Sequence, residues 1–245
     1  MTGNEPLGIV IQKRDYGIRD EFDTAITVAS GQQISIIAGF TSVTRVNARL
    51  LALTRAGFLK RVAIGRNEWA YMLPGTSPGN AGTVPAILFT RHQLAVTEVY
   101  IAVRYRAIPL PGVRLSRWSR FNEPVSKTIP LKPDAYFELE AQTYIRPFFV
   151  EVDLGSEPLP VWRKKTDAYV RQLAASGDFQ KIFGQPQFRV LVVANTDRRL
   201  AGIRSTVAKS TDKIFWLTSL ERIHRDGFWA PIWLRPTGDG RSPLI

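Results

Sequence analysis

The chain has 245 residues, which is long enough for one large domain or two small ones with a buried core. Its 33 Lys and Arg outnumber 21 Asp and Glu, and this formal net charge of +12 favours a polyanionic partner such as nucleic acid. No cysteine and only two histidines are present, which excludes disulfides and a structural zinc site. The polar start and the lack of a long apolar run predict a cytoplasmic protein without a membrane span.

The first part of the chain predicts three short helices followed by two short strands. Helices are expected over residues 16–28 and 30–38, and a third helix begins after Thr41 or Ser42 and ends at Gly57. Strands over 58–63 and 68–73 flank a turn at Gly65-Arg66-Asn67. Three helices and a hairpin in this order are typical of a winged helix-turn-helix, which we expect to occupy residues 1–76.

The segment from Ser42 to Arg66 contains six Lys or Arg and no acid. Such clustering of positive charge favours binding to double-stranded DNA. In a helix-turn-helix the third helix presents its polar side chains to the major groove. The residues expected to contact DNA are Ser42, Thr44, Arg45, Asn47, Ala48, Arg49, Arg61 and Arg66. The alternative is a winged helix that binds another protein, with these arginines forming a solvated face.

Proline and glycine cluster most densely at residues 74–82, where we expect the domain boundary, with a second domain at 84–245. This second part alternates between helical and strand patterns. Helices are expected over 90–104, from Pro160 onward and over 196–207, and strands over 135–140, 148–153, 188–194, 214–217 and 228–233. Because strands alternate with helices, we predict an α/β fold, or α+β for the chain as a whole.

Acidic residues concentrate in the two strands over 135–140 and 148–153. Residues 121–160 hold seven Asp or Glu against three Lys or Arg. Alternation along the second strand places Glu151 and Asp153 on one face, and Asp134 begins the first strand. Lys165 and Tyr169 share one stripe of the following helix, from which Lys165 can lean over the carboxylates. The pattern therefore predicts either a structural Glu151–Lys165 ion pair or a cation site.

Taken in order, these segments resemble the replication-relaxation family of plasmid and mobile-element proteins. The similar segments are residues 16–73, 92–100, Trp118 with Glu123, 132–137, 149–155, Lys165 with Tyr169, 188–194 and 215–220. The resemblance implies a winged helix followed by a restriction-endonuclease-like α/β core with a mixed sheet. It also implies a DNA-binding accessory or regulatory protein of plasmid or mobile-element replication, relaxation or transfer. Its candidate partners are double-stranded DNA, a second copy of the chain, and replication or transfer proteins.

The resemblance to nuclease cores implies an alternative function, a metal-dependent DNA endonuclease or nickase. In such cores an Asp and a Glu-x-Lys pair hold a divalent metal ion. Asp134 and Glu151 match the acids, but Asp153 stands where the lysine is expected, so Lys165 becomes the candidate lysine. Asp134, Glu151 and Asp153 would then bind Mg²⁺ or Mn²⁺, and Lys165 would orient or deprotonate the attacking water. A core that has lost this activity and serves as a scaffold fits the same pattern.

Overall fold

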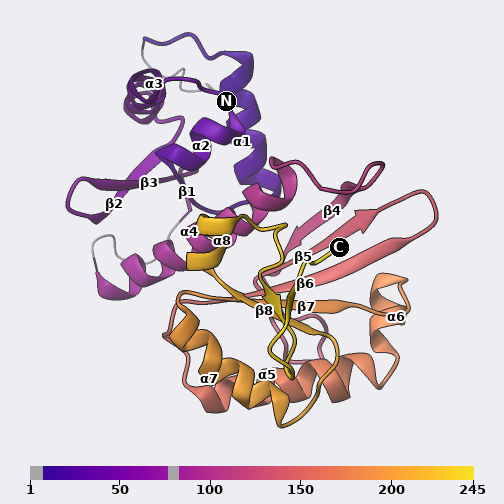
Figure 1. Ribbon diagram of the computed structural model, residues 1–245. Helices are drawn as coiled ribbons and strands as arrows, with labels where there is room; N and C mark the ends of the chain where they lie inside the picture. Colours follow the sequence, from indigo (N-terminus) through magenta and orange to yellow (C-terminus); the bar gives the residue numbers. More distant parts are fainter. Residues whose placement is uncertain (1–7, 77–82) are drawn as a thin grey trace. The chain divides into compact units, whose positions relative to one another are not determined.

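The computed structural model describes residues 8–76 and 83–245 (Figure 1). The chain divides into two compact units, Met1–Arg106 and Ala107–Ile245. No helix in the described part is long and apolar enough to cross a membrane. Residues 77–82, which belong to the expected boundary loop, lie outside the described residues.

The first unit consists of helices around a small antiparallel sheet. Its elements are α1 (Lys13–Thr24), β1 (Ala29–Ser30), α2 (Gly31–Ile37), α3 (Val43–Arg55), β2 (Lys60–Gly65), β3 (Glu68–Met72) and α4 (Val84–Arg104). The sheet has the order β1-β3-β2, so the hairpin β2–β3 gains a third strand from the segment before α2. The helix expected over 16–28 instead begins at Lys13, because Gln12 and Asp15 form a capping box there.

Local signals at the helix ends and the turn hold as expected. The hydroxyl of Ser30 accepts the N–H of Gln33 at 3.2 Å and begins α2, and Ser42 caps α3 in the same way. Gly57, just beyond α3, has a φ of 72°, the left-handed conformation that glycine adopts without steric cost. Three helices followed by a hairpin are therefore present in the predicted order, although the first helix ends at Thr24 and not at residue 28.

Helix α4 belongs to the first unit, whereas the sequence assigned it to the second. Its Thr97 hydroxyl donates to the Val28 carbonyl at 2.7 Å, and its Leu94 carbonyl accepts from the Gln33 side chain at 2.9 Å. Leu94 also packs against the small core formed by Val28, Val62, Ala70 and Met72. The expected division at residues 76–84 therefore differs from the observed one at 106, because a proline and glycine cluster marks a break in secondary structure and not a break in packing.

The second unit is built on a seven-stranded mixed sheet. Its strands are β4 (Arg114–Arg120), β5 (Ala135–Glu140), β6 (Ile145–Asp153), β7 (Arg189–Ala194), β8 (Phe215–Ser219), β9 (Trp233–Leu234) and β10 (Arg241–Ser242). The order is β10-β9-β8-β7-β6-β5-β4, with β6, β7 and β8 parallel and the other neighbours antiparallel. The expected mixed α/β arrangement is confirmed. Strand β4 was not expected, since its sequence RLSRWSR lacks an apolar face of its own.

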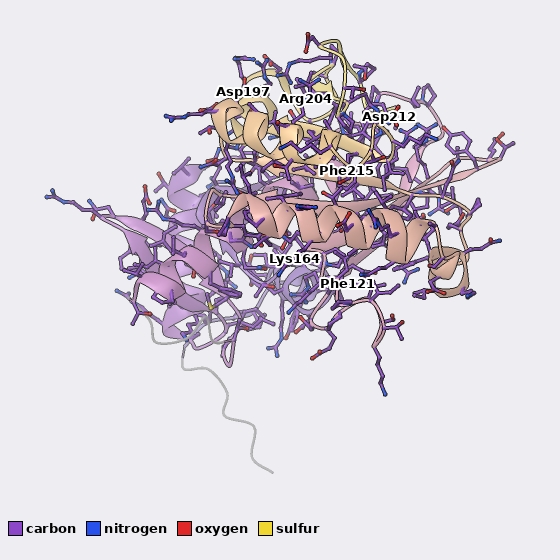
Figure 2. All side chains as sticks on the ribbon, turned by 90° about the horizontal axis from the view of Figure 1, so that it is seen from below. Phe121, Lys164, Asp197, Arg204, Asp212 and Phe215 are labelled. Atoms are coloured by element: carbon purple, nitrogen blue, oxygen red, sulfur yellow. The ribbon has the colours of Figure 1, made fainter. Side chains whose placement is uncertain are left out.

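Helices of the second unit cover one face of this sheet. They are α5 (Leu159–Asp167), the π-helical turn η1 (Ala168–Ala174), α6 (Asp178–Phe183) and α7 (Asp197–Ala208), and a further helix, α8 (Leu220–Asp226), follows β8. Figure 2 shows α5 with η1 and α7 lying next to each other, in agreement with their contacts. Trp162, Tyr169 and Ile203 pack from these helices onto Phe149 and Val192 of the sheet. The same face of β6 carries Glu151 and Asp153, so both acids lie under the helices.

We expect residues 1–106 to fold as an independent unit and residues 1–76 to be markedly less stable. The shorter fragment loses α4, which supplies Leu94 to the core and partners for Gln33 and the Val28 carbonyl. A loss of about 2–3 kcal/mol would lower the melting temperature of a domain of this size by about 10–20 °C. Thermal unfolding followed by circular dichroism compares the two fragments, and equal melting temperatures would contradict the assignment of α4.

Candidate functional site

Asp134 and Glu151 are brought together by the pairing of β5 with β6. Ala135 pairs with Val150, so Asp134, one residue earlier, lies beside Glu151 on the adjacent strand. The Asp134 N–H donates to the Val150 carbonyl at 3.1 Å, and the Val152 N–H donates to Asp134 Oδ2 at 2.7 Å. The expected proximity of these two carboxylates is therefore present in the structure.

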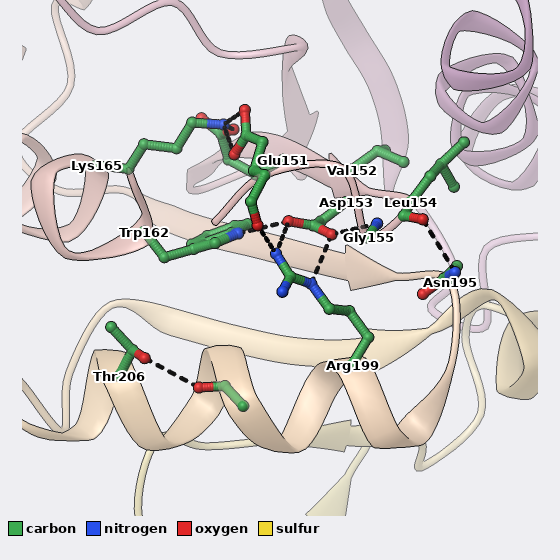
Figure 3. A network of polar contacts seen from close by, with 12 residues as sticks. Glu151, Val152, Asp153, Leu154, Gly155, Trp162, Lys165, Asn195, Arg199 and Thr206 are labelled. Carbon is green, nitrogen blue, oxygen red and sulfur yellow. Dashed lines mark hydrogen bonds and ion pairs between the residues drawn. The ribbon is translucent and has the colours of Figure 1, made fainter. Parts of the chain in front are cut away.

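Glu151 is fully buried, and both of its carboxylate oxygens have partners from the covering helix, of which Figure 3 shows Lys165. Lys165 Nζ lies 2.9 Å from Oε2, and the Tyr169 hydroxyl donates to Oε1 at 2.7 Å. Lys165 also donates to Glu157 at 3.0 Å, and its ammonium lies 5.2 Å from the centre of the Trp162 ring. The four-residue spacing of Lys165 and Tyr169 thus brings both side chains onto one carboxylate.

Burial and the neighbouring charges act in opposite directions on this pair. Burial raises the pKa of the Glu151 carboxyl above its ordinary 4.5, the Lys165 ammonium opposes that rise, and the nearby Asp134 carboxylate adds to it. Burial lowers the pKa of Lys165, but attraction to Glu151 and Glu157 outweighs it, so that pKa lies above its ordinary 10.5. Lys165 is therefore the positive charge on which an ionised Glu151 depends.

Asp153 occupies a separate environment on the same strand. The Arg199 guanidinium donates through Nε to Oδ1 and through Nη2 to Oδ2, both at 2.8 Å, and the Trp162 indole donates to Oδ2 at 2.6 Å (Figure 3). The Gly155 N–H also donates to Oδ1 at 2.6 Å. Burial alone would raise the pKa of Asp153, but these hydrogen bonds outweigh it and hold the pKa below its ordinary 3.8. Asp153 is therefore the anchor of α7 on the sheet.

Arg199 is a residue that the sequence interpretation missed. It lies in the first turn of α7, directly after β7, and β7 pairs with β6 so that Ala194 lies beside Asp153. A helix that follows a parallel strand begins at the carboxyl edge of the sheet, which is the edge where Asp153 ends β6. Its position after the predicted strand 188–194 is the signal that could have identified it.

The three acids expected to bind a metal ion do not form one ligand set. Asp134 and Glu151 adjoin each other, but the counter-charge beside Glu151 is the Lys165 ammonium, and Asp153 is held by Arg199. Among residues 8–76 and 83–245, no three Asp, Glu or His side chains converge to hold a metal ion. A hard dication takes six or more oxygen ligands, so this arrangement suits the lysine better than Mg²⁺ or Mn²⁺.

A groove of about 1010 Å³ lies between α3 and the β2–β3 hairpin in the first unit. Four of the residues expected to bind DNA line it: Thr44, Asn47 and Ala48 from α3, and Arg61 from β2. Arg45 is exposed on α3, Arg66 is exposed at the hairpin turn, and Ser42 caps the helix. Trp69, which the sequence interpretation did not single out, also lines the groove, and the Arg61 guanidinium lies 3.9 Å above its ring.

Arg49 has a different role from the expected one. Its Nε donates to Asp15 Oδ1 at 3.0 Å, its Nη2 contacts Asp15 Oδ2, and the same nitrogen donates to the Val10 carbonyl at 2.7 Å. Asp15 is fully buried, so this pair ties α3 to α1. The acid-free segment from Ser42 to Arg66 concealed this contact, because the acid that pairs with Arg49 lies 34 residues earlier in the chain.

The model of the replication-relaxation family matches residues 25–185, which is more than half of the chain. The chain belongs to the replication-relaxation family. The matched residues include α3, the hairpin, Glu151 and Lys165, and they end before Arg199. Membership thus covers both the groove and the Glu151–Lys165 pair.

No curated protein matches the chain. Among solved structures, restriction endonuclease FokI is similar at 14% identity and a TM-score of 0.37, over 87% of this chain and 43% of that one. FokI bound to DNA is similar at 10% identity and a TM-score of 0.30, over 90% and 46%. The replication-relaxation chain therefore spans less than half the length of that enzyme. With both TM-scores below 0.5, this similarity supports no structural conclusion.

We expect Lys165→Met to destabilise the protein by about 3–5 kcal/mol near pH 8, because a buried carboxylate loses its counter-charge. A carboxyl whose folded pKa is raised contributes stability below its unfolded pKa and loses it as pH rises through the folded value. The loss should therefore be much smaller near pH 5, where Glu151 takes up a proton. Urea unfolding at both pH values measures this difference.

Two further variants control that measurement. Lys164→Met removes an exposed lysine from the preceding position of the same helix (Figure 2) and should behave like the wild type. Adding Glu151→Gln to Lys165→Met should recover part of the stability near pH 8, since the unpaired charge is gone. A loss of the same size at both pH values would contradict an ion pair at this position.

Proposed function

We propose that the chain is a DNA-binding accessory or regulatory protein of plasmid or mobile-element replication, relaxation or transfer. Membership of the replication-relaxation family supports the role in replication or relaxation. The observation that carries the DNA-binding part is the groove between α3 and the β2–β3 hairpin, with Asn47 and Arg61 on its walls. Arg45 and Arg66 extend the positive charge beyond it.

In this proposal the first unit acts as a winged helix. Helix α3 enters the major groove with Thr44, Asn47 and Ala48 toward base edges, since an amide side chain reads adenine and a methyl group contacts thymine. The hairpin β2–β3 acts as the wing, with Arg66 at its turn placed for a phosphate. The stacking of Arg61 on Trp69 holds its guanidinium in one orientation at the wall of the groove.

The second unit serves assembly in this proposal. Its two buried acids on β6, Glu151 and Asp153, are held by Lys165 and Arg199. These pairs connect the sheet rigidly to its helices. A second copy of the chain and replication or transfer proteins are the partners we propose for it. We place the protein in the cytoplasm, where plasmid DNA is replicated and transferred.

The second candidate function is metal-dependent cleavage of DNA. It is supported by one observation, the adjacency of Asp134 and Glu151 with the Lys165 ammonium against them. It has less support than the first, because Asp153 is bound to Arg199 and the remaining acids suit a lysine. We infer that the unit is a scaffold with the form of a nuclease core.

Variants of three arginines on α3 test the DNA-binding proposal. Arg45→Ala should weaken duplex binding by about 1–3 kcal/mol if the guanidinium reads a base, and should lower the salt dependence by about one charge if it binds a phosphate. Arg55→Ala removes the same charge from the exposed far end of α3 and should leave affinity near the wild-type value. Arg49→Ala should lower stability, because the buried Asp15 carboxylate loses its counter-charge and keeps its contact with the Gln12 N–H.

These variants are compared by fluorescence anisotropy with labelled duplex over a range of salt concentrations, and by thermal unfolding. A double variant that combines Arg45→Ala with Arg61→Ala is the decisive case. If it binds the duplex with wild-type affinity at every salt concentration, DNA binding through this groove is contradicted.

A nicking assay separates the two candidate functions. Under the scaffold proposal, supercoiled plasmid stays intact with the protein in Mg²⁺ or Mn²⁺, and Glu151→Gln leaves duplex affinity unchanged. Nicks that require the metal ion and disappear in Glu151→Gln would favour the nuclease instead. The metal-free reaction and the exposed Lys164→Met variant serve as matched controls.

A further inference from the structure

A pocket of about 220 Å³ opens in the second unit where β6 and β7 begin. The two strands pair only from Phe148 and Arg189 onward, so the chain segments before that point diverge. Residues 144–147 and 187–189 line the gap. Because Glu151 and Asp153 lie near the carboxyl ends of the parallel strands, the pocket is at the opposite edge of the sheet.

The lining of this pocket carries two guanidinium groups and no acid. Arg146 lies with its guanidinium 5.1 Å from the centre of the Tyr144 ring. It makes no hydrogen bond or ion pair with any residue in the parts of the chain that the structure describes. Its donors are therefore available to a ligand within the pocket.

Arg189 is held rigidly on the other wall. Its Nη1 donates to the Leu244 carbonyl at 2.8 Å, and its guanidinium lies 4.8 Å from the centre of the Trp216 ring. Arg235 lies 4.6 Å from the same ring, so a third positive charge is close by. Burial, together with repulsion from Arg146 and Arg235, lowers the pKa of Arg189 to about 10. Within the described residues, no carboxylate forms an ion pair with Arg189.

The Arg146 and Arg189 guanidinium groups line the pocket and repel each other, and an anion bound between them offsets this repulsion. Guanidinium groups bind phosphate through two parallel hydrogen bonds, and a dianion offsets two charges at once. The volume is too small for a duplex but suits a phosphate with a few attached atoms. We propose that this pocket binds a phosphate monoester, either on a free nucleotide or at the end of a nucleic-acid strand. The half-exposed ring of Tyr144 flanks the pocket, where a base can stack on it.

This pocket is separate from the DNA groove that we propose in the first unit, and its binding does not depend on that proposal. The two sites lie in different compact units and share no residue. Arg45→Ala should therefore leave phosphate binding unchanged, and variants of the pocket should leave duplex binding through α3 unchanged.

Calorimetric titration of the full-length protein tests the proposal with two pairs of probes. Thymidine 5′-monophosphate is compared with thymidine, and a short oligothymidine carrying a 5′-phosphate is compared with the same strand ending in a hydroxyl. In each pair the phosphorylated probe should bind at least about tenfold more tightly, as expected for charge-assisted hydrogen bonds. The advantage should decrease below about pH 6, where a phosphate monoester loses its second negative charge.

Two variants locate the site, and a third is the matched control. Arg146→Ala removes a donor, and Gln187→Glu places a negative charge in the lining at an exposed position where folding is not disturbed. Both should abolish the advantage of the phosphorylated probes, whereas Arg171→Ala, an exposed arginine of η1, should retain it. Preference for the strand over the nucleotide would identify a strand end as the ligand, and the reverse would identify a free nucleotide. Equal binding of phosphorylated and unphosphorylated probes, or wild-type binding by folded Gln187→Glu, would overturn the proposal.

Discussion

The burial of two carboxylates side by side on one strand is the constraint on which the second unit depends. Glu151 and Asp153 point to the same face of β6, under the helices, and neither can remain ionised there without a positive partner. Glu151 requires Lys165 from α5, and Asp153 requires Arg199 from α7. Trp162 connects the two pairs, because its indole N–H binds Asp153 while its ring faces the Lys165 ammonium. The positions of both helices on the sheet follow from these contacts.

The first unit is organised by the same rule. Asp15 is fully buried on α1 and is paired with Arg49 of α3, which fixes the helix that we propose to read DNA. An arginine that holds the helix in place is not available to a phosphate. Counting basic residues along α3 therefore overstates its surface for nucleic acid. Arg45 stays exposed, and the groove beside it adds residues such as Asn47 and Arg61.

Arginine side chains line two surfaces with different shapes. The groove at α3 is wide, and its walls combine a polar helix face with a hairpin, which suits an extended polyanion. The pocket at Arg146 and Arg189 is small and has aromatic rings beside its guanidinium groups, which suits a single anionic group. Because shape limits what can approach, the two surfaces are expected to select different parts of a nucleic acid.

The sequence by itself determined the features that depend on neighbours a few residues apart. Ser42 begins α3 and Gly57 follows its end, because a cap and a left-handed residue act within one turn of helix. Alternation predicted that Glu151 and Asp153 share a face, and a four-residue spacing predicted that Lys165 and Tyr169 share a stripe. Only the tertiary structure decided which charge meets which.

Arg199 reaches Asp153 across 46 residues, and α4 joins the first unit through Leu94. Ion pairing and packing depend on distances in space, and these are set when separate segments cover the same face of a sheet. The periodic pattern of apolar and polar residues, and hydrogen bonds between near neighbours in sequence, carry no information about such distances.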